Sequence, residues 1–257
     1  MAASPLWRGL RAVGRLSRTS VHVLHGLAIT LLLFPRLDAQ ARAAKIRWWS
    51  LKVLRLMGVE LLHHGFARPG AKLLVANHVS WMDILAIHAV CPDARFVSKS
   101  DVRRWPLLGV LVAAAGTLFI ERERKRDALR VVHRMAEALQ AGETVAIFPE
   151  GTTTDGSMLL PFHANLLQAA IASETPVQPV ALAYADAEHP ISRAVSFVGE
   201  TTLVQSLWRT ANAQQLRVSV QLLPARSVRH ADRRRLALTL VGDIAAAINV
   251  PAASAEV

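Results

Sequence analysis

Cysteine, charged residues and several common catalytic motifs are scarce or missing in this chain of 257 residues. Its single cysteine, Cys91, excludes an intramolecular disulfide and a cysteine-rich zinc site. The sequence has no Gly-x-Ser-x-Gly elbow of a serine hydrolase, no phosphate-binding loop ending in Gly-Lys-Ser/Thr and no Gly-x-Gly-x-x-Gly fingerprint. Charged residues make up 19% and hydrophobic residues 52%, which excludes an intrinsically disordered chain. We predict no metal and no cofactor.

Acidic residues are outnumbered, and the excess of positive charge lies mostly at the amino-terminal end. The chain has 30 Lys and Arg against 19 Asp and Glu, a net charge of +11. Residues 1–60 hold ten of the basic residues and two acids, so they carry +8 of this charge. A basic segment can bind nucleic acid or anionic lipid. Long apolar runs interleave with the charges, which favours lipid, and we predict no nucleic-acid partner.

The amino-terminal segment has two helical patterns that suit a membrane surface. Residues 21–34 carry no formal charge, but this run is shorter than the roughly 20 residues of a spanning helix. Residues 43–62 mix Trp48 and Trp49 with Lys and Arg, residue types that favour lipid headgroups and phosphates. We expect residues 1–66 to form a helical pair that enters one leaflet at the cytoplasmic face of the inner membrane. A membrane-spanning helix, a signal peptide and a buried hairpin of a soluble protein are the alternatives.

Residues 67–257 have the alternating pattern of an α/β domain. Helices are predicted over residues 84–89, 127–140 and 233–248, and residues 105–120 suggest a buried helix that leads into a strand. Strands that alternate with helices predict a mixed, largely parallel sheet flanked by helices, with the site at the carboxyl ends of the strands. The predicted strands are residues 72–76, 95–99, 117–121, 144–148, 177–183, 194–198 and 218–223.

A histidine and an aspartate follow the first of these strands. His78 and Asp83 cannot share one face of a regular helix, because five residues rotate by 500°. At a strand-to-helix turn, however, the Asp83 carboxylate could accept the Nδ1 proton of His78 and hold the imidazole as a general base. Ser80-x-x-Asp83 also resembles a capping box, which would fix the aspartate at the start of a helix.

Two further strands deliver polar residues to their carboxyl ends. Arg122 follows the strand at 117–121 and could bind a phosphate through two N–H groups of its guanidinium. Alternatively, it belongs to a run of charged residues that is simply exposed to solvent where the strand ends. Glu150, Gly151 and Thr152 follow the strand at 144–148, where glycine and hydroxyl residues leave N–H groups free for an anion. Residues 177–180 are mostly core and could line the path of an acyl chain.

These four segments, in this order, resemble the glycerolipid acyltransferase superfamily, whose bacterial type member is 1-acyl-sn-glycerol-3-phosphate acyltransferase. Its pattern is His-x4-Asp, Gly-x-x-Phe-Ile-x-Arg, Phe-Pro-Glu-Gly-Thr and a Val/Ile-rich block with proline. The resemblance implies acyl transfer from acyl-carrier protein or acyl-CoA to the hydroxyl of a lysophospholipid, which forms phosphatidic acid from 1-acyl-sn-glycerol-3-phosphate. It also implies His78 as the base, Asp83 as its partner, no covalent acyl-enzyme, and a binding role for Arg122, Glu150, Gly151 and Thr152.

One departure from the family pattern leaves the acceptor open. Members that use lysophosphatidate often have arginine after Glu-Gly-Thr, where this chain has Thr153. The stretch that begins at Glu150 is also similar to lyso-ornithine lipid acyltransferases. Two other classes stay open at this point. They are a lipid hydrolase or thioesterase with Ser80 as nucleophile, and a basic binding protein with no catalytic activity.

Overall fold

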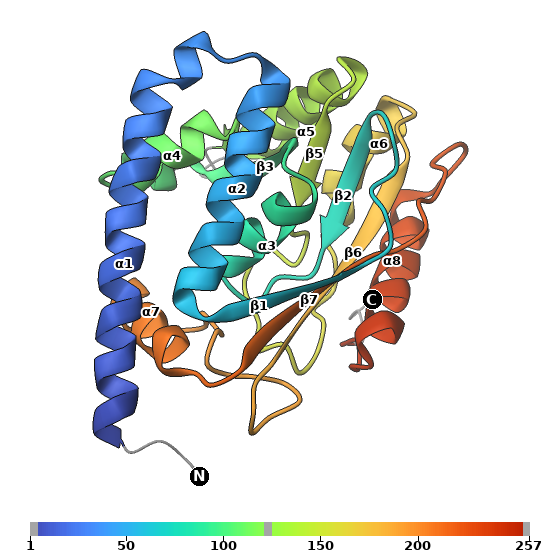
Figure 1. The fold of residues 1–257 in the computed structure, drawn as a ribbon. Helices are drawn as coiled ribbons and strands as arrows, with labels where there is room; N and C mark the ends of the chain where they lie inside the picture. The colour runs from blue at the N-terminus through green and yellow to red at the C-terminus, as the bar shows by residue number, and fades with distance from the viewer. Residues whose placement is uncertain (1–4, 121–124, 254–257) are drawn as a thin grey trace.

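The computed structural model describes residues 5–120 and 125–253, in which a mixed, largely parallel sheet carries helices on both faces (Figure 1). The strand order in this part of the chain is β1-β7-β6-β2-β5-β3-β4. Five neighbouring strands, from β4 to β6, are parallel, whereas β7 is antiparallel to β6 and parallel to β1. This confirms the predicted fold class. The strands are β1 (Val59–His64), β2 (Lys72–Ala76), β3 (Ala94–Lys99), β4 (Leu118–Ile120), β5 (Thr144–Ile147), β6 (Val177–Ala185) and β7 (Leu216–Leu222).

The helices form two layers, one on each face of the sheet. α2, α3 and α7 pack on one face, with α1 along their outer side, and α5, α6 and α8 cover the other (Figure 1). The α-helices are α1 (Pro5–Leu32), α2 (Ala39–Met57), α3 (Met82–Val90), α4 (Leu108–Ala114), α5 (Lys125–Gln140), α6 (Gln168–Ala172), α7 (Leu203–Asn212) and α8 (Arg233–Ile248). The 3-10 helices are η1 (Phe34–Arg36), η2 (Ser100–Arg104) and η3 (Ala164–Leu167).

Strand β2 shows why the sheet is covered on both faces. Its side chains alternate, so that Leu74 and Ala76 join the layer of α2 and α3 while Leu73 and Val75 join that of α5 and α8. All four are buried. A central parallel strand buried on both sides has the continuous apolar sequence seen here. β2 and β5 pair directly, which brings the segments that follow them, residues 77–83 and 148–154, to one edge of the sheet.

The prediction of a helix over residues 43–62 is wrong at its end. α2 starts after Asp38, whose carboxylate accepts the Ala41 N–H at 2.7 Å, and it stops at Gly58. Gly58 has φ +76°, a left-handed conformation that glycine adopts at helix ends. The next residues form β1, which pairs with β7. β1 therefore belongs to the central sheet although it precedes residue 66. The division of the chain at that residue remains a prediction.

Part of the positive charge in α1 holds the helix to α7. Arg15 Nη1 donates to the carbonyls of Ala211 and Ala213 at 2.9 and 3.0 Å, and Arg11 Nη2 donates to that of Asn212 at 3.1 Å. These carbonyls lie at the carboxyl end of α7, where helix carbonyls lack partners and the helix dipole favours cations. α1 thus has an inner face that contacts the domain and an outer face that does not.

Two other predictions need correction. Residues 194–198 form an irregular loop instead of a strand, and their N–H groups bond to nearby loops, such as Phe197 N–H to the Val79 carbonyl at 3.2 Å. The apolar character that suggested a strand comes from side chains that pack inward from this loop, of which Val195 is fully buried. The run at 105–120 does contain a helix, α4, that leads into strand β4. That helix lies half exposed beside α1 and is not buried.

Candidate active site

His78 and Asp83 meet at the carboxyl end of β2, as the sequence predicts. His78 Nδ1 lies 2.7 Å from Asp83 Oδ2, and the two side chains are 20% and 0% exposed. A carboxylate only accepts hydrogen bonds, so Nδ1 carries the proton and Nε2 keeps its lone pair. No hydrogen bond to Nε2 is formed by the described residues. The imidazole is therefore oriented to accept a proton at Nε2.

Four donors hold the Asp83 carboxylate. Besides His78, the backbone N–H groups of Val79 and Ser80 donate to Oδ2 at 2.7 and 2.9 Å, and the Tyr184 hydroxyl donates to Oδ1 at 2.6 Å. Half of the predicted capping box is thus present. The Ser80 hydroxyl does not complete it, because the Asp83 N–H donates to the Ser80 carbonyl instead. The same carboxylate holds the turn that precedes α3 and orients the histidine.

Sequence reasoning missed Tyr184, the only tyrosine of the chain. It lies in β6, is 3% exposed, and is 101 residues from Asp83. Burial, together with the charge and hydrogen bond of Asp83, raises the pKa of the Tyr184 hydroxyl well above its usual value, so it stays a donor. A lone tyrosine in an apolar strand was the signal available, since a buried hydroxyl needs a partner.

The loop after β5 holds the backbone of His78 from both sides. Glu150 Oε1 accepts the His78 N–H at 2.7 Å, and Thr154 N–H donates to the His78 carbonyl at 2.8 Å. The ring of Phe148 stacks on the imidazole, with centroids 4.0 Å apart and planes 10° apart. The loop thus fixes both the position and the plane of the base.

Glu150 has both carboxyl oxygens engaged. Oε2 accepts the Leu160 N–H at 3.0 Å, and the residue is 4% exposed. Burial raises the pKa of Glu150 to about 7, against the lowering effect of the N–H donors from Leu160 and His78. With these contacts, Glu150 holds the His78 segment and the Leu160 segment together. The family resemblance, in contrast, implies that Glu150 helps to bind the substrate.

Gly151 and Thr152 lie beside Glu150 with different surroundings. Gly151 has φ +73°, and a Cβ there would lie 3.1 Å from the His163 ring, so both the turn and the space favour glycine. Thr152 is exposed, and the Thr153 hydroxyl donates to the Phe197 carbonyl. Among the threonines at 152–154, Thr152 is therefore the one that is exposed to solvent.

The structure says less about the other segments predicted to form the site. Arg122 lies outside the described residues, just after β4. In β6, the Gln178 amide is 2% exposed and bonds to the Phe66 and Leu223 carbonyls and the Arg68 N–H at 2.9–3.0 Å. It ties loops to the sheet, as a core residue would. Among the described residues, no group of three or more His, Cys, Asp or Glu could hold a metal ion.

The fold agrees with what comparisons with known proteins show. Residues 61–183 match the family model described as Acyltransferase. A lyso-ornithine lipid O-acyltransferase of Pseudomonas aeruginosa is 40% identical over 191 residues, which are 74% of this chain and 73% of that protein. The chain belongs to this acyltransferase family and is an acyltransferase of lipid metabolism.

One further relative and one solved structure are also similar to this chain. A 1-acyl-sn-glycerol-3-phosphate acyltransferase of Neisseria gonorrhoeae is 37% identical over 167 residues, which are 65% of each chain. The crystal structure of the 1-acyl-sn-glycerophosphate acyltransferase PlsC from Thermotoga maritima superposes with a TM-score of 0.72 at 17% identity, over 93% of this chain and 94% of that one. That structure has the same fold.

Proposed function

We propose that this enzyme moves a fatty acyl group from acyl-carrier protein or acyl-CoA to the free hydroxyl of a lysolipid, with His78 as general base. Nε2 takes the hydroxyl proton as the oxygen attacks the thioester carbonyl. The tetrahedral intermediate then expels the thiolate, which receives the proton from the imidazolium and leaves as a thiol. The observation that carries this proposal is the 2.7 Å contact between His78 Nδ1 and a fully buried Asp83.

A nucleophilic serine is not supported at this site. Ser80 is fully buried, and its hydroxyl accepts a long hydrogen bond of 3.4 Å from the Met82 N–H. A hydrolase or thioesterase mechanism would need that oxygen within reach of both the imidazole and the substrate. Direct attack by the acceptor hydroxyl, without a covalent acyl-enzyme, fits the orientation of His78 better.

The proposed acceptor is 1-acyl-sn-glycerol-3-phosphate, which gives phosphatidic acid, with Arg122 as the main candidate for its phosphate. Glu150, Gly151 and Thr152 would shape the rest of the headgroup site. Lyso-ornithine lipid is the second candidate. Two observations favour it: the neutral Thr153, whose hydroxyl is already used in the loop, and the name of the Pseudomonas aeruginosa relative.

The proposed location is the cytoplasmic face of the inner membrane, reached through α1. The segment Leu6–Arg36 is long and apolar enough to cross a membrane by length and composition. Six of its exposed large side chains recur at helical spacing on one face and are 52–73% exposed. An apolar face of this size is typical of a helix that contacts lipid. This outer stripe consists of Leu6, Leu10, Val13, Val21, Leu24 and Leu31.

The acceptor is tested with purified protein and a labelled acyl donor, given as acyl-carrier protein and as acyl-CoA. Lysophosphatidate and lyso-ornithine lipid are supplied in parallel reactions. We expect labelled phosphatidic acid as the main product. Preferred labelling of ornithine lipid would assign the second acceptor. Release of free fatty acid alone, lost in Ser80→Ala, would contradict both assignments.

A further inference from the structure

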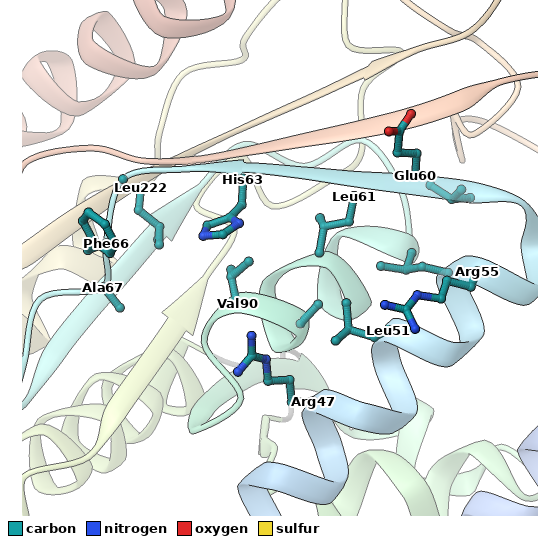
Figure 2. A pocket seen from close by; sticks show the side chains of 14 residues that line it. Arg47, Leu51, Arg55, Glu60, Leu61, His63, Phe66, Ala67, Val90 and Leu222 are labelled. Atoms are coloured by element: carbon teal, nitrogen blue, oxygen red, sulfur yellow. The ribbon is translucent and has the colours of Figure 1, made fainter.

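A groove lies between α2, β1 and the end of α3, away from the catalytic pair. Its volume is about 540 Å³, and Figure 2 shows the side chains that line it. α3 starts beside Asp83 and ends at Val90, which lines the groove. At 1.5 Å per residue, these two positions are about 10 Å apart along the helix. The proposed mechanism uses none of the residues that line it.

Basic side chains converge on this groove. Figure 2 shows Arg47 and Arg55 of α2 turned toward it from either side of Leu51, with the His63 ring of β1 on the same side. Glu60, the acidic residue of the lining, points to the opposite side of β1 (Figure 2). Within residues 5–120 and 125–253, neither guanidinium forms a hydrogen bond or an ion pair.

The other walls of the groove are apolar. Leu51, Leu61 and Val90 lie between the basic groups, and Phe66, which is 88% exposed, lies at one end (Figure 2). Free phosphate would leave these apolar walls uncovered, and a neutral lipid would leave two guanidinium groups without an anion. Paired cations beside apolar walls match a phosphate that carries an acyl chain.

We propose that this groove binds one anionic phospholipid of the membrane, with its phosphate between Arg47 and Arg55 and part of an acyl chain along Leu61 and Val90. The proposal rests on the proposed membrane location but not on the acceptor or on the catalytic mechanism. α2 packs against α1, whose outer stripe is the proposed lipid contact, so the helix that carries Arg47 and Arg55 is joined to the proposed membrane anchor. Trp48, 43% exposed, neighbours Arg47 and is of the type that lies at headgroup level.

The test is native mass spectrometry of the full chain in detergent, with dioctanoyl phosphatidylglycerol as the probe and dioctanoyl phosphatidylcholine and inorganic phosphate as comparisons. The groove variant is Arg47→Ser/Arg55→Ser. The matched control is Lys45→Ser/Lys52→Ser, which removes two exposed positive charges from the same helix outside the groove lining. Circular dichroism and acyl transfer in detergent show whether each variant is folded.

We expect one tightly bound phosphatidylglycerol on the unmodified chain and on the lysine control, and at least about tenfold weaker binding to the arginine variant. Acyl transfer in detergent should be unchanged in both variants. Equal binding by the arginine variant would overturn the proposal, as would equal loss in both variants. Phosphate binding as strong as that of the lipid would assign a free anion instead. Because the readout is bound lipid, an enzyme that fails to acylate either acceptor still gives a result.

Discussion

At the residue scale, the hydroxyl of Tyr184 donates a hydrogen bond to Asp83 Oδ1, whereas the backbone N–H groups donate to Oδ2. Tyr184→Phe leaves Asp83 Oδ1 buried without this donor. We expect kcat to fall by about 10- to 100-fold, the range for a hydrogen bond to a charged group, with little change in KM. A carboxylate that has lost a donor attracts the imidazole proton more strongly, so the acidic limb of the rate–pH profile should move to higher pH. Unchanged kcat and an unmoved limb would show that Tyr184 serves packing alone.

Also at the residue scale, Glu150 makes the free energy of unfolding depend on pH. Its pKa of about 7 in the folded chain lies above the usual 4.5, so the folded state binds the proton more tightly than the unfolded state. This group's contribution to the free energy of unfolding is therefore largest below pH 4.5 and falls as the pH rises to about 7.

Glu150→Gln should remove that dependence and lower stability. An amide can accept only one of the two backbone N–H bonds through its oxygen, and the other N–H faces an NH₂ group. We expect a loss of about 1–3 kcal/mol. Thermal unfolding at about pH 5 and about pH 8 measures both effects. If the variant's midpoint still falls between these pH values by as much as that of the unmodified chain, another group is responsible.

At the scale of elements, the outer stripe of α1 carries the proposed membrane contact. Replacing Leu6, Leu10 and Leu24 with serine should weaken binding to vesicles strongly, because each leucine contributes about 1.5–3 kcal/mol when buried in an apolar medium. Co-flotation with vesicles measures the bound fraction. The control replaces Leu129, Val204 and Leu238, which are 62–74% exposed on other helices. Equal loss in both triple variants, or no loss in the α1 variant, would contradict this role.

The elements also show which parts of the fold the sequence could predict and why the other parts could not be predicted. The bounds of β2 and α8 agree with their predictions. Residues 73–76 of β2 are an uninterrupted apolar run, and the structure shows that the Asp232 carboxylate caps the start of α8. The sequence pattern places residues 59–62 of β1 in the preceding helix, since their apolar residues continue the helical pattern and only Gly58 signals the break. The contacts of Tyr184 with Asp83, and of Arg15 with the end of α7, join distant residues. No local pattern contains them.

At the scale of the whole molecule, the net charge of +11 divides into separate roles. Arg11 and Arg15 hold α1 to α7, while Arg47 and Arg55 face the groove beside β1. The positive charge of the amino-terminal region therefore joins α1 to the α/β domain in addition to its proposed attraction to anionic lipid. The His–Asp pair lies at the carboxyl edge of the sheet, where the sequence predicts it.

The initial rate of acyl transfer to a lysolipid by His78→Ala, relative to the unmodified chain, tests the central claim most directly. Because His78 would be the general base, the rate should fall by about 10²- to 10⁴-fold. The thermal midpoint should change little, since both backbone bonds of His78 to the loop after β5 remain. Transfer at an undiminished rate by a folded His78→Ala variant would contradict the account.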